Sequence, residues 1–154
     1  MSKQITSSTL TELLSSLATE APTLRGVTLE KIHRTLRGSE ENRFDFIMED
    51  GIAKMIEMLR SPSCQVNELS LVLSVIISVT DDAKYLWSSI WEAVGNVEVL
   101  VQLLQKHHHD KRVFRNLLRM IVELIQAKSL NFQNNQFVQW MMICLLYTSP
   151  SPRD

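Results

Sequence analysis

The chain has 154 residues, of which 45% are hydrophobic and 21% charged, and its 16 basic and 17 acidic residues give a formal net charge of −1. The hydrophobic fraction is too high and the net charge too low for an intrinsically disordered chain. The balanced charge excludes the broad basic excess that sequence-independent nucleic-acid binding requires. Two cysteines cannot build a disulfide scaffold, which favours a reducing compartment.

The N-terminal segment, residues 1–7, is polar and is expected to be flexible, without the apolar core of a signal peptide. The longest apolar stretch, from Leu69 to Val79, is interrupted by serines. It is also shorter than the roughly 20 residues that span a bilayer. We therefore expect a cytoplasmic or nuclear protein that does not associate with a membrane.

Apolar residues recur at helical spacing along most of the chain, and no segment shows sustained alternation of apolar and polar residues. Two segments carry the clearest stripes, at Leu69, Val72, Leu73, Ile76 and Ile77 and at Leu117, Met120, Ile121, Leu124 and Ile125. Spacing of three and four residues places such side chains on one face of a buried helix. The sequence therefore predicts an all-α fold.

The expected helix ends are marked by glycine, proline and capping residues. Gly38, Gly51 and Gly95 close periodic segments, where a left-handed C-cap favours glycine. Pro62 indicates a turn between two helices. Ser39 and the pair Asp81 and Asp82 are expected to lie at helix N-termini, as cap residues and acids.

The same helical pattern appears more than once along the chain. Three leucines that end short apolar segments, Leu14, Leu59 and Leu104, are spaced by 45 residues. The apolar stripes that follow two of these segments are offset by 48 residues, from Leu69 to Leu117. An internal period in the forties, with three helices in each unit, is typical of a helical solenoid.

Residues 42–59, with the sequence NRFDFIMEDGIAKMIEML, resemble an armadillo repeat. The family pattern is a first helix, a glycine, a short second helix ending in a leucine pair, a turn and a long third helix. A second copy runs from Tyr85 through Gly95 to Leu104 and then from Val113 to Gln126. HEAT repeats share this physical pattern.

The resemblance implies a right-handed α-α superhelix of the armadillo or HEAT type, with about two full repeats and partial ones. The units are expected at residues 8–37, 39–80 and 82–128, with the start of another at 131–143.

In the armadillo family the third helices line a concave face. The resemblance thus implies a partner-binding surface formed by Lys31, Arg34, Arg37, Asn67, Ser70, Ser74, Ser78, Arg112, Arg115, Asn116 and Arg119. Two basic patches on either side of a neutral one would receive an acidic or phosphorylated segment of a protein partner. The alternative is that these residues form ordinary solvated helix surfaces.

The expected function is that of a protein–protein interaction scaffold or adaptor. The alternative is the N-terminal repeat array of a larger regulatory protein, such as a ubiquitin-ligase adaptor. No catalytic residue, cofactor or metal site is expected: Cys64 has no basic partner indicated by the sequence. The consecutive histidines 107–109 cannot easily converge on one ion.

Large side chains on the first helices are expected to pack between units. Trp87 and Trp91, four residues apart, either form this packing or an exposed docking ridge, and the first option is favoured. Phe44 and Ile47, with Phe46, are expected to fill the analogous place one unit earlier, and Met55, Met58 and Met120 to fill gaps in the core.

Residues 144–154, with the sequence CLLYTSPSPRD, match the in-frame translation of a common transposase sequencing adapter. Such a segment is excluded from fold reasoning; the alternative is a natural disordered tail. We expect the natural protein to continue beyond Ile143. The cut end would expose Phe137, Trp140, Met141, Met142 and Ile143 and promote self-association.

Overall fold

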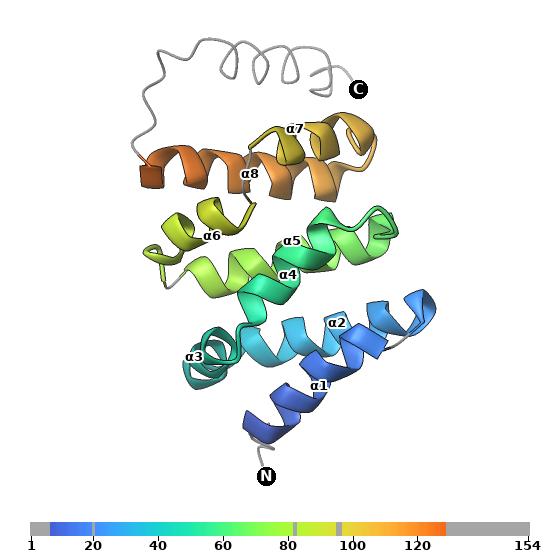
Figure 1. Ribbon diagram of the computed structural model, residues 1–154, viewed down its shortest axis with the longest axis vertical. Coiled ribbons are helices and arrows are strands. Elements are labelled where there is room, and N and C mark those ends of the chain that lie inside the picture. The colour runs from blue at the N-terminus through green and yellow to red at the C-terminus, as the bar shows by residue number, and fades with distance from the viewer. Residues whose placement is uncertain (1–6, 20, 82, 95–96, 129–154) are drawn as a thin grey trace.

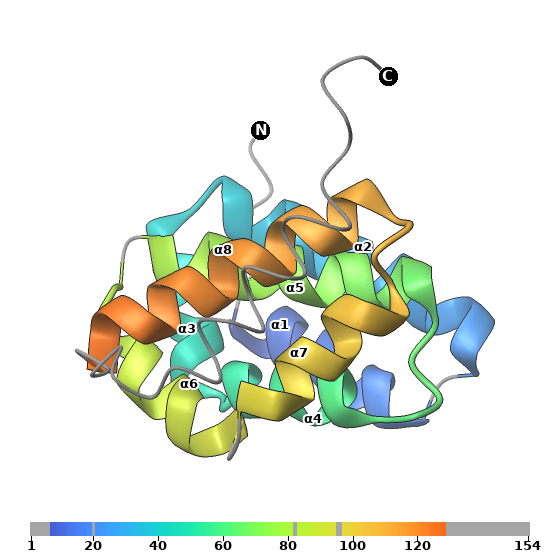
Figure 2. The same cartoon turned by 90° about the horizontal axis from the view of Figure 1, so that it is seen from above.

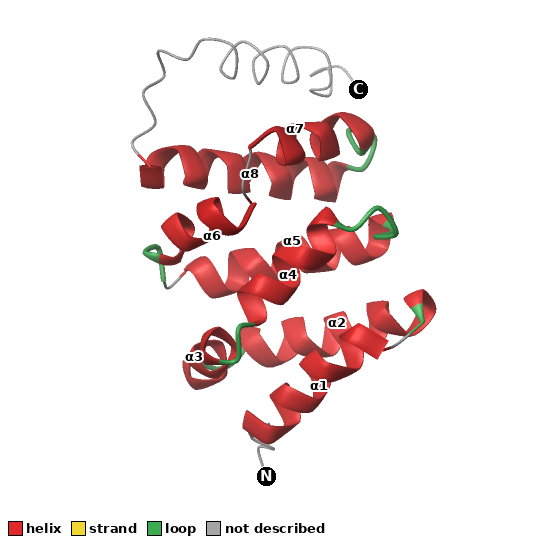
Figure 3. Cartoon of the chain, viewed as in Figure 1, coloured by secondary structure: helices red, strands yellow, loops and turns green. Residues whose placement is uncertain are grey.

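The computed structural model describes residues 7–19, 21–81, 83–94 and 97–128, and these ranges consist of helices and loops without a strand (Figure 3). The expected all-α fold is confirmed for them. The helices are α1 (Ser7–Thr19), α2 (Pro22–Arg37), α3 (Glu40–Met48), α4 (Gly51–Arg60), α5 (Val66–Asp81), α6 (Leu86–Val94), α7 (Val97–Lys106) and α8 (Lys111–Lys128). The expected unit at 131–143, its apolar end and the adapter-like tail lie outside the described residues.

The three long helices are stacked, with α5 packed on α2 and α8 packed on α5 (Figure 1). The shorter helices pack beside them: α1 against α2 and α3, α4 against α5 and α6, and α7 against α8. Seen along the stack, α2, α5 and α8 lie on one side and α4 and α7 on the other (Figure 2). The order of a short, a short and a long helix occurs in α3–α5 and again in α6–α8.

Each long helix buries one apolar stripe in a shared core. Fully buried members are Leu29, Ile32 and Leu36 of α2, Val72, Leu73 and Ile76 of α5, and Val113, Leu117 and Ile121 of α8. Burying such a side chain stabilises the fold by about 1.5–3 kcal/mol. The stripes that the sequence predicted for α5 and α8 are therefore the ones that hold the stack together.

The large residues of the first helices divide between core and surface. Trp87 is only 2% exposed and Met55 is fully buried, as expected. Phe46 is fully buried and Ile47 packs partly buried against the core, but Phe44 is 58% exposed, so the prediction was wrong for Phe44. Residues two positions apart point in directions about 200° apart on a helix, so only one can face the core. The side chain of Trp91 lies outside the described residues.

Gly38 and Gly51 do not act as left-handed caps, and Gly95 lies outside the described residues. Gly38 has a φ of −95°, and the left-handed residue before α4 is Asp50, with a φ of 58°. Aspartate tolerates this conformation better than most residues. Gly51 begins α4, where an added Cβ would lie 2.5 Å from the Phe46 ring. Glycine is required there for close packing and not for its backbone freedom.

Ser39 does cap α3, because its side chain accepts a hydrogen bond from the Asn42 amide at 3.1 Å.

A buried ion pair joins α2 to α5. The Arg25 Nη2 and Glu68 Oε2 atoms are 3.4 Å apart, with 18% of the Arg25 side chain and 2% of the Glu68 side chain exposed. Neither Glu68 oxygen has a hydrogen-bond partner within the described residues. A carboxylate this deeply buried depends on its cation, because burying an unpaired charge costs several kcal/mol.

We expect Arg25→Met to lower the free energy of unfolding by about 3 kcal/mol, because Glu68 would be left buried without its cation. The double variant Arg25→Met and Glu68→Met should recover most of that loss. Urea unfolding followed by far-UV circular dichroism measures both. If the single variant is as stable as the parent chain, the pair does not contribute to stability.

We expect Gly51→Ala to destabilise the chain by about 1–3 kcal/mol, because its Cβ would overlap the Phe46 ring. The matched control is Gly26→Ala in α2, where nothing lies within 4 Å of an added Cβ. The control should gain up to about 1 kcal/mol from helix propensity alone. Thermal unfolding of the two variants in parallel compares them, and equal shifts would contradict the packing argument.

Candidate functional site

The expected binding residues lie on the three stacked helices. The helix α5 packs on α2, α4 and α8. The side of α5 that these helices leave uncovered faces away from α4 (Figure 2). We call the corresponding outer surface of α2, α5 and α8 the long-helix face. It comprises Lys31, Arg34, Arg37, Asn67, Ser70, Ser74, Ser78, Arg112, Arg115, Asn116 and Arg119.

The structure leaves most of these side chains accessible. Lys31, Arg34, Arg37, Asn67, Arg112, Arg115 and Arg119 are exposed, and Ser70, Ser74, Ser78 and Asn116 are half-buried. The α5 and α8 residues are joined directly, because the Asn116 side-chain amide donates to the Ser74 hydroxyl at 3.4 Å. Within the described residues, no hydrogen bond or ion pair joins Lys31, Arg34 or Arg37 to α5 or α8.

Two of the expected cations are already neutralised. Arg34 pairs with Glu30 at 2.8 Å on the same helix, and Arg119 donates to Asp81 at 3.1 Å across the α5–α8 contact. Asp81 and Asp82 were expected at a helix N-terminus, but Asp81 is the last residue of α5 and Asp82 lies outside the described residues. Exposed pairs of this kind stabilise a fold by only about 0–1 kcal/mol. Their main effect is to remove positive charge from the face.

The cations that remain form two pairs at the ends of the face. Within the described residues, Lys31 and Arg37 on α2 and Arg112 and Arg115 on α8 have no ion-pair partner. Packed helix axes lie about 8–10 Å apart, so α2 and α8 are separated by about 18 Å across α5. An extended chain rises about 3.3 Å per residue, so about six residues would span that distance.

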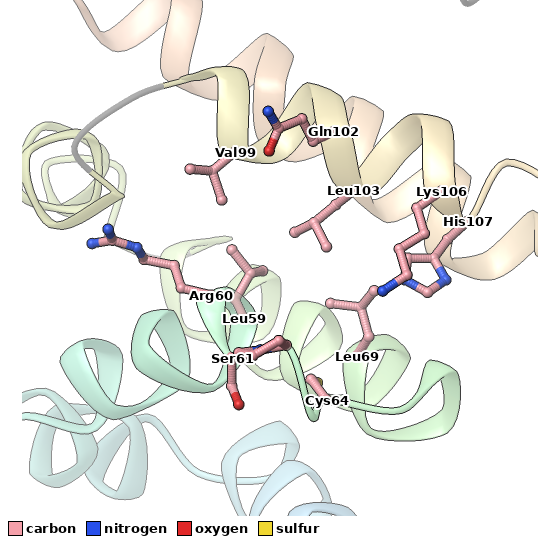
Figure 4. A pocket seen from close by; sticks show the side chains of 11 residues that line it. Leu59, Arg60, Ser61, Cys64, Leu69, Val99, Gln102, Leu103, Lys106 and His107 are labelled. Carbon is pink, nitrogen blue, oxygen red and sulfur yellow. The ribbon is translucent and has the colours of Figure 1, made fainter.

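A cavity of about 200 Å³ lies away from the long-helix face, between the C-terminal end of α4 and α7. Leu59, Leu69, Val99 and Leu103 line it, and Figure 4 shows Arg60 on one side and Lys106 with His107 on the other. Its walls come from two segments, residues 59–69 and 99–107, that are distant in the sequence, so no local motif reveals it. The repeated leucine segments that end at Leu59 and Leu104 were the only signal in the sequence.

Burial keeps the thiol and the imidazole of the cavity neutral. Burial raises the pKa of the Cys64 thiol from 9.0 to about 11, and the negative charge of Glu68 adds to this rise. Burial also lowers the pKa of His107, and the neighbouring Lys106 ammonium lowers it further. At neutral pH the cavity therefore presents a protonated thiol and an uncharged imidazole.

Comparisons with known proteins do not identify the chain. No protein-family model matches it, and no match was found among curated proteins or among solved structures. The armadillo resemblance therefore stays a prediction. In the described ranges, no group of three or more His, Cys, Asp and Glu side chains is placed to hold a metal ion. No helix in those ranges is long and apolar enough to cross a bilayer.

The alkylation rate of Cys64 by iodoacetamide is expected to keep rising by about tenfold per pH unit until the pH approaches 11, because only the thiolate reacts. Mass spectrometry of a Cys144→Ser chain would give the rate at this thiol alone. The same chain in urea supplies the control, where the rate should level off near the ordinary thiol pKa of 9.0. A folded-state plateau near that value would contradict a buried, neutral thiol.

Proposed function

We propose that this chain is a non-catalytic scaffold of the armadillo or HEAT type, in the cytoplasm or nucleus, that binds an extended acidic or phosphorylated segment of a partner protein on its long-helix face. The observation that carries the proposal is the placement, on either side of the polar surface of α5, of two cations on α2 and two on α8 that have no ion-pair partner among the described residues. The stacking of α2, α5 and α8 supports the superhelix that the armadillo resemblance implies.

Each part of the face would contribute a different interaction. Arg112 and Arg115 lie three residues apart on α8, which places them on one helix face for a phosphate or carboxylate. Lys31 and Arg37 would receive a second acidic group on α2. Between them, Asn67 and Ser70 offer an amide and a hydroxyl to the backbone of the bound segment.

Apolar contact would add to these charges. Val27 is 52% exposed one turn before Lys31, and Val122 is 41% exposed one turn after Arg119. An aliphatic side chain of the partner could cover each valine, which would remove apolar surface from water at both ends of the face. The proposed ligand therefore carries two acidic groups about six residues apart with apolar residues beside them.

The test uses a fluorescent peptide of about seven residues with phosphoserine at both ends, spaced to reach α2 and α8. We expect Lys31→Glu and Arg115→Glu each to weaken binding at least about tenfold, because each replaces a charge-assisted contact by repulsion. Fluorescence anisotropy measures the dissociation constants, and far-UV circular dichroism shows that the helices remain. Binding should also weaken as salt is raised.

Lys54→Glu on α4 provides the matched control, because it reverses the same charge on the side of the stack that carries α4. It should leave the dissociation constant unchanged. A single-stranded DNA oligonucleotide at equal phosphate concentration should compete poorly. Equal losses in all three variants, or stronger binding of the oligonucleotide, would refute a segment-specific site on this face.

A further inference from the structure

The cavity between α4 and α7 has an apolar floor, and the residues that form this floor belong to the hydrophobic core or pack against it. Leu59 and Leu69 are each about 1% exposed, and Val99 and Leu103 are partly buried against the same core. A volume of about 200 Å³ is sufficient for one large apolar side chain, since a dry cavity of about 150 Å³ accommodates benzene. Water would find few hydrogen-bond partners on this floor.

The rim of the cavity is basic. Arg60 and Lys106 both line it, and no Asp or Glu lines it among the side chains that the structure describes. Lys106 has no ion-pair or hydrogen-bond partner among the residues that the structure describes. Arg60 donates from Nη1 to the Ala93 carbonyl oxygen at 3.5 Å, so its other N–H groups are available to a ligand. Figure 4 shows the two cations on opposite sides of the floor.

We infer that this cavity is a second docking site, which takes a peptide segment of a partner protein with one large apolar side chain flanked by carboxylates. The apolar side chain fills the space above Leu59 and Leu103, and the carboxylates pair with Arg60 and Lys106. Charge complementarity selects this occupant, because a basic peptide would face two cations and an uncharged one would leave them unpaired. The site does not depend on the long-helix face.

The His107 imidazole strengthens the recognition. Its neighbour Lys106 and its partial burial keep it uncharged near neutral pH, so it can donate to or accept from the backbone of the bound segment. Cys64 lies in the cavity wall as a protonated thiol. It has no chemical role in the proposal, but an occupant would shield it, which makes it a reporter.

The experiment measures protection of Cys64 in a Cys144→Ser chain. The probe is the tripeptide acetyl-Asp-Phe-Asp-amide, with acetyl-Asp-Ala-Asp-amide and acetyl-Lys-Phe-Lys-amide as controls. At saturation the probe should slow iodoacetamide modification of Cys64 about tenfold, and the two controls should have no effect. Amide chemical shifts in a nitrogen-15 spectrum should change mainly for residues 59–64 and 99–107.

Charge-reversal variants measure the contribution of the rim cations separately from that of the apolar floor. Lys106→Glu and Arg60→Glu should each raise the dissociation constant of the probe about tenfold, because each removes a charge-assisted contact. Lys31→Glu, the same charge reversal on the long-helix face, should leave it unchanged. Each variant's amide spectrum shows whether the chain still folds, and a conservative Lys106→Arg variant should keep most of the affinity.

Several outcomes would overturn the inference. If the alanine peptide protects Cys64 as well as the probe does, the apolar floor does not contribute to binding. If Lys106→Glu and Arg60→Glu both leave the affinity unchanged, the basic rim does not contribute. Binding of 3-phenylpropionate as tight as that of the probe would indicate a small-molecule site. Protection of Cys64 that grows with protein concentration in the absence of peptide would indicate that a second copy of the chain occupies the cavity.

Discussion

The packing of α5 between α2 and α8 is the contact on which the other features depend. The helices α3, α4, α6 and α7 have only 9 or 10 residues, and isolated helices of that length are marginal in water. They persist because the long helices give their apolar faces a surface to cover. The stripes of α5 and α8 consist mostly of Leu, Ile and Val. Three helices alone, such as α3–α5, would leave part of this apolar surface exposed to water, and the stacking of α5 on α2 and α8 buries it.

Both candidate surfaces follow from this packing. The long-helix face is what remains of α2, α5 and α8 once their inner sides are buried, so polar and cationic residues collect there. The cavity arises on the other side, where the short helices α4 and α7 cover the stack less completely than the long ones. The chemistry differs accordingly: the first surface is broad and polar, and the second is small with an apolar floor. One chain could hold two different segments of a partner in this way.

The sequence predicts the helices well because their apolar spacing is a local property. The stripe from Leu69 to Ile76, the Ser39 cap and the turn at Pro62 all depend on residues close in the chain. What the sequence did not reveal depends on partners far away. The contact of Asp81 with Arg119 has no local signal, since the two residues are 38 positions apart, so the sequence suggested a helix cap instead. The packing role of Gly51 becomes visible only once the position of the Phe46 ring is known. A charged residue directly before Leu69, inside a buried stripe, was the one visible signal of the ion pair between α2 and α5.

That ion pair would also disfavour an exchange of long helices between two copies of this chain. The offset of 48 residues that relates α5 to α8 places Asn116 at the position equivalent to Glu68. If α8 of another molecule docked on α2 in a domain-swapped dimer, Arg25 would meet a neutral amide instead of a carboxylate. Its guanidinium would then lose both solvent and counter-ion, which is costly in a partly buried site. The two long helices share the same apolar pattern, and Glu68 is one of the charged residues that distinguish the correct neighbour of α2 from the wrong one.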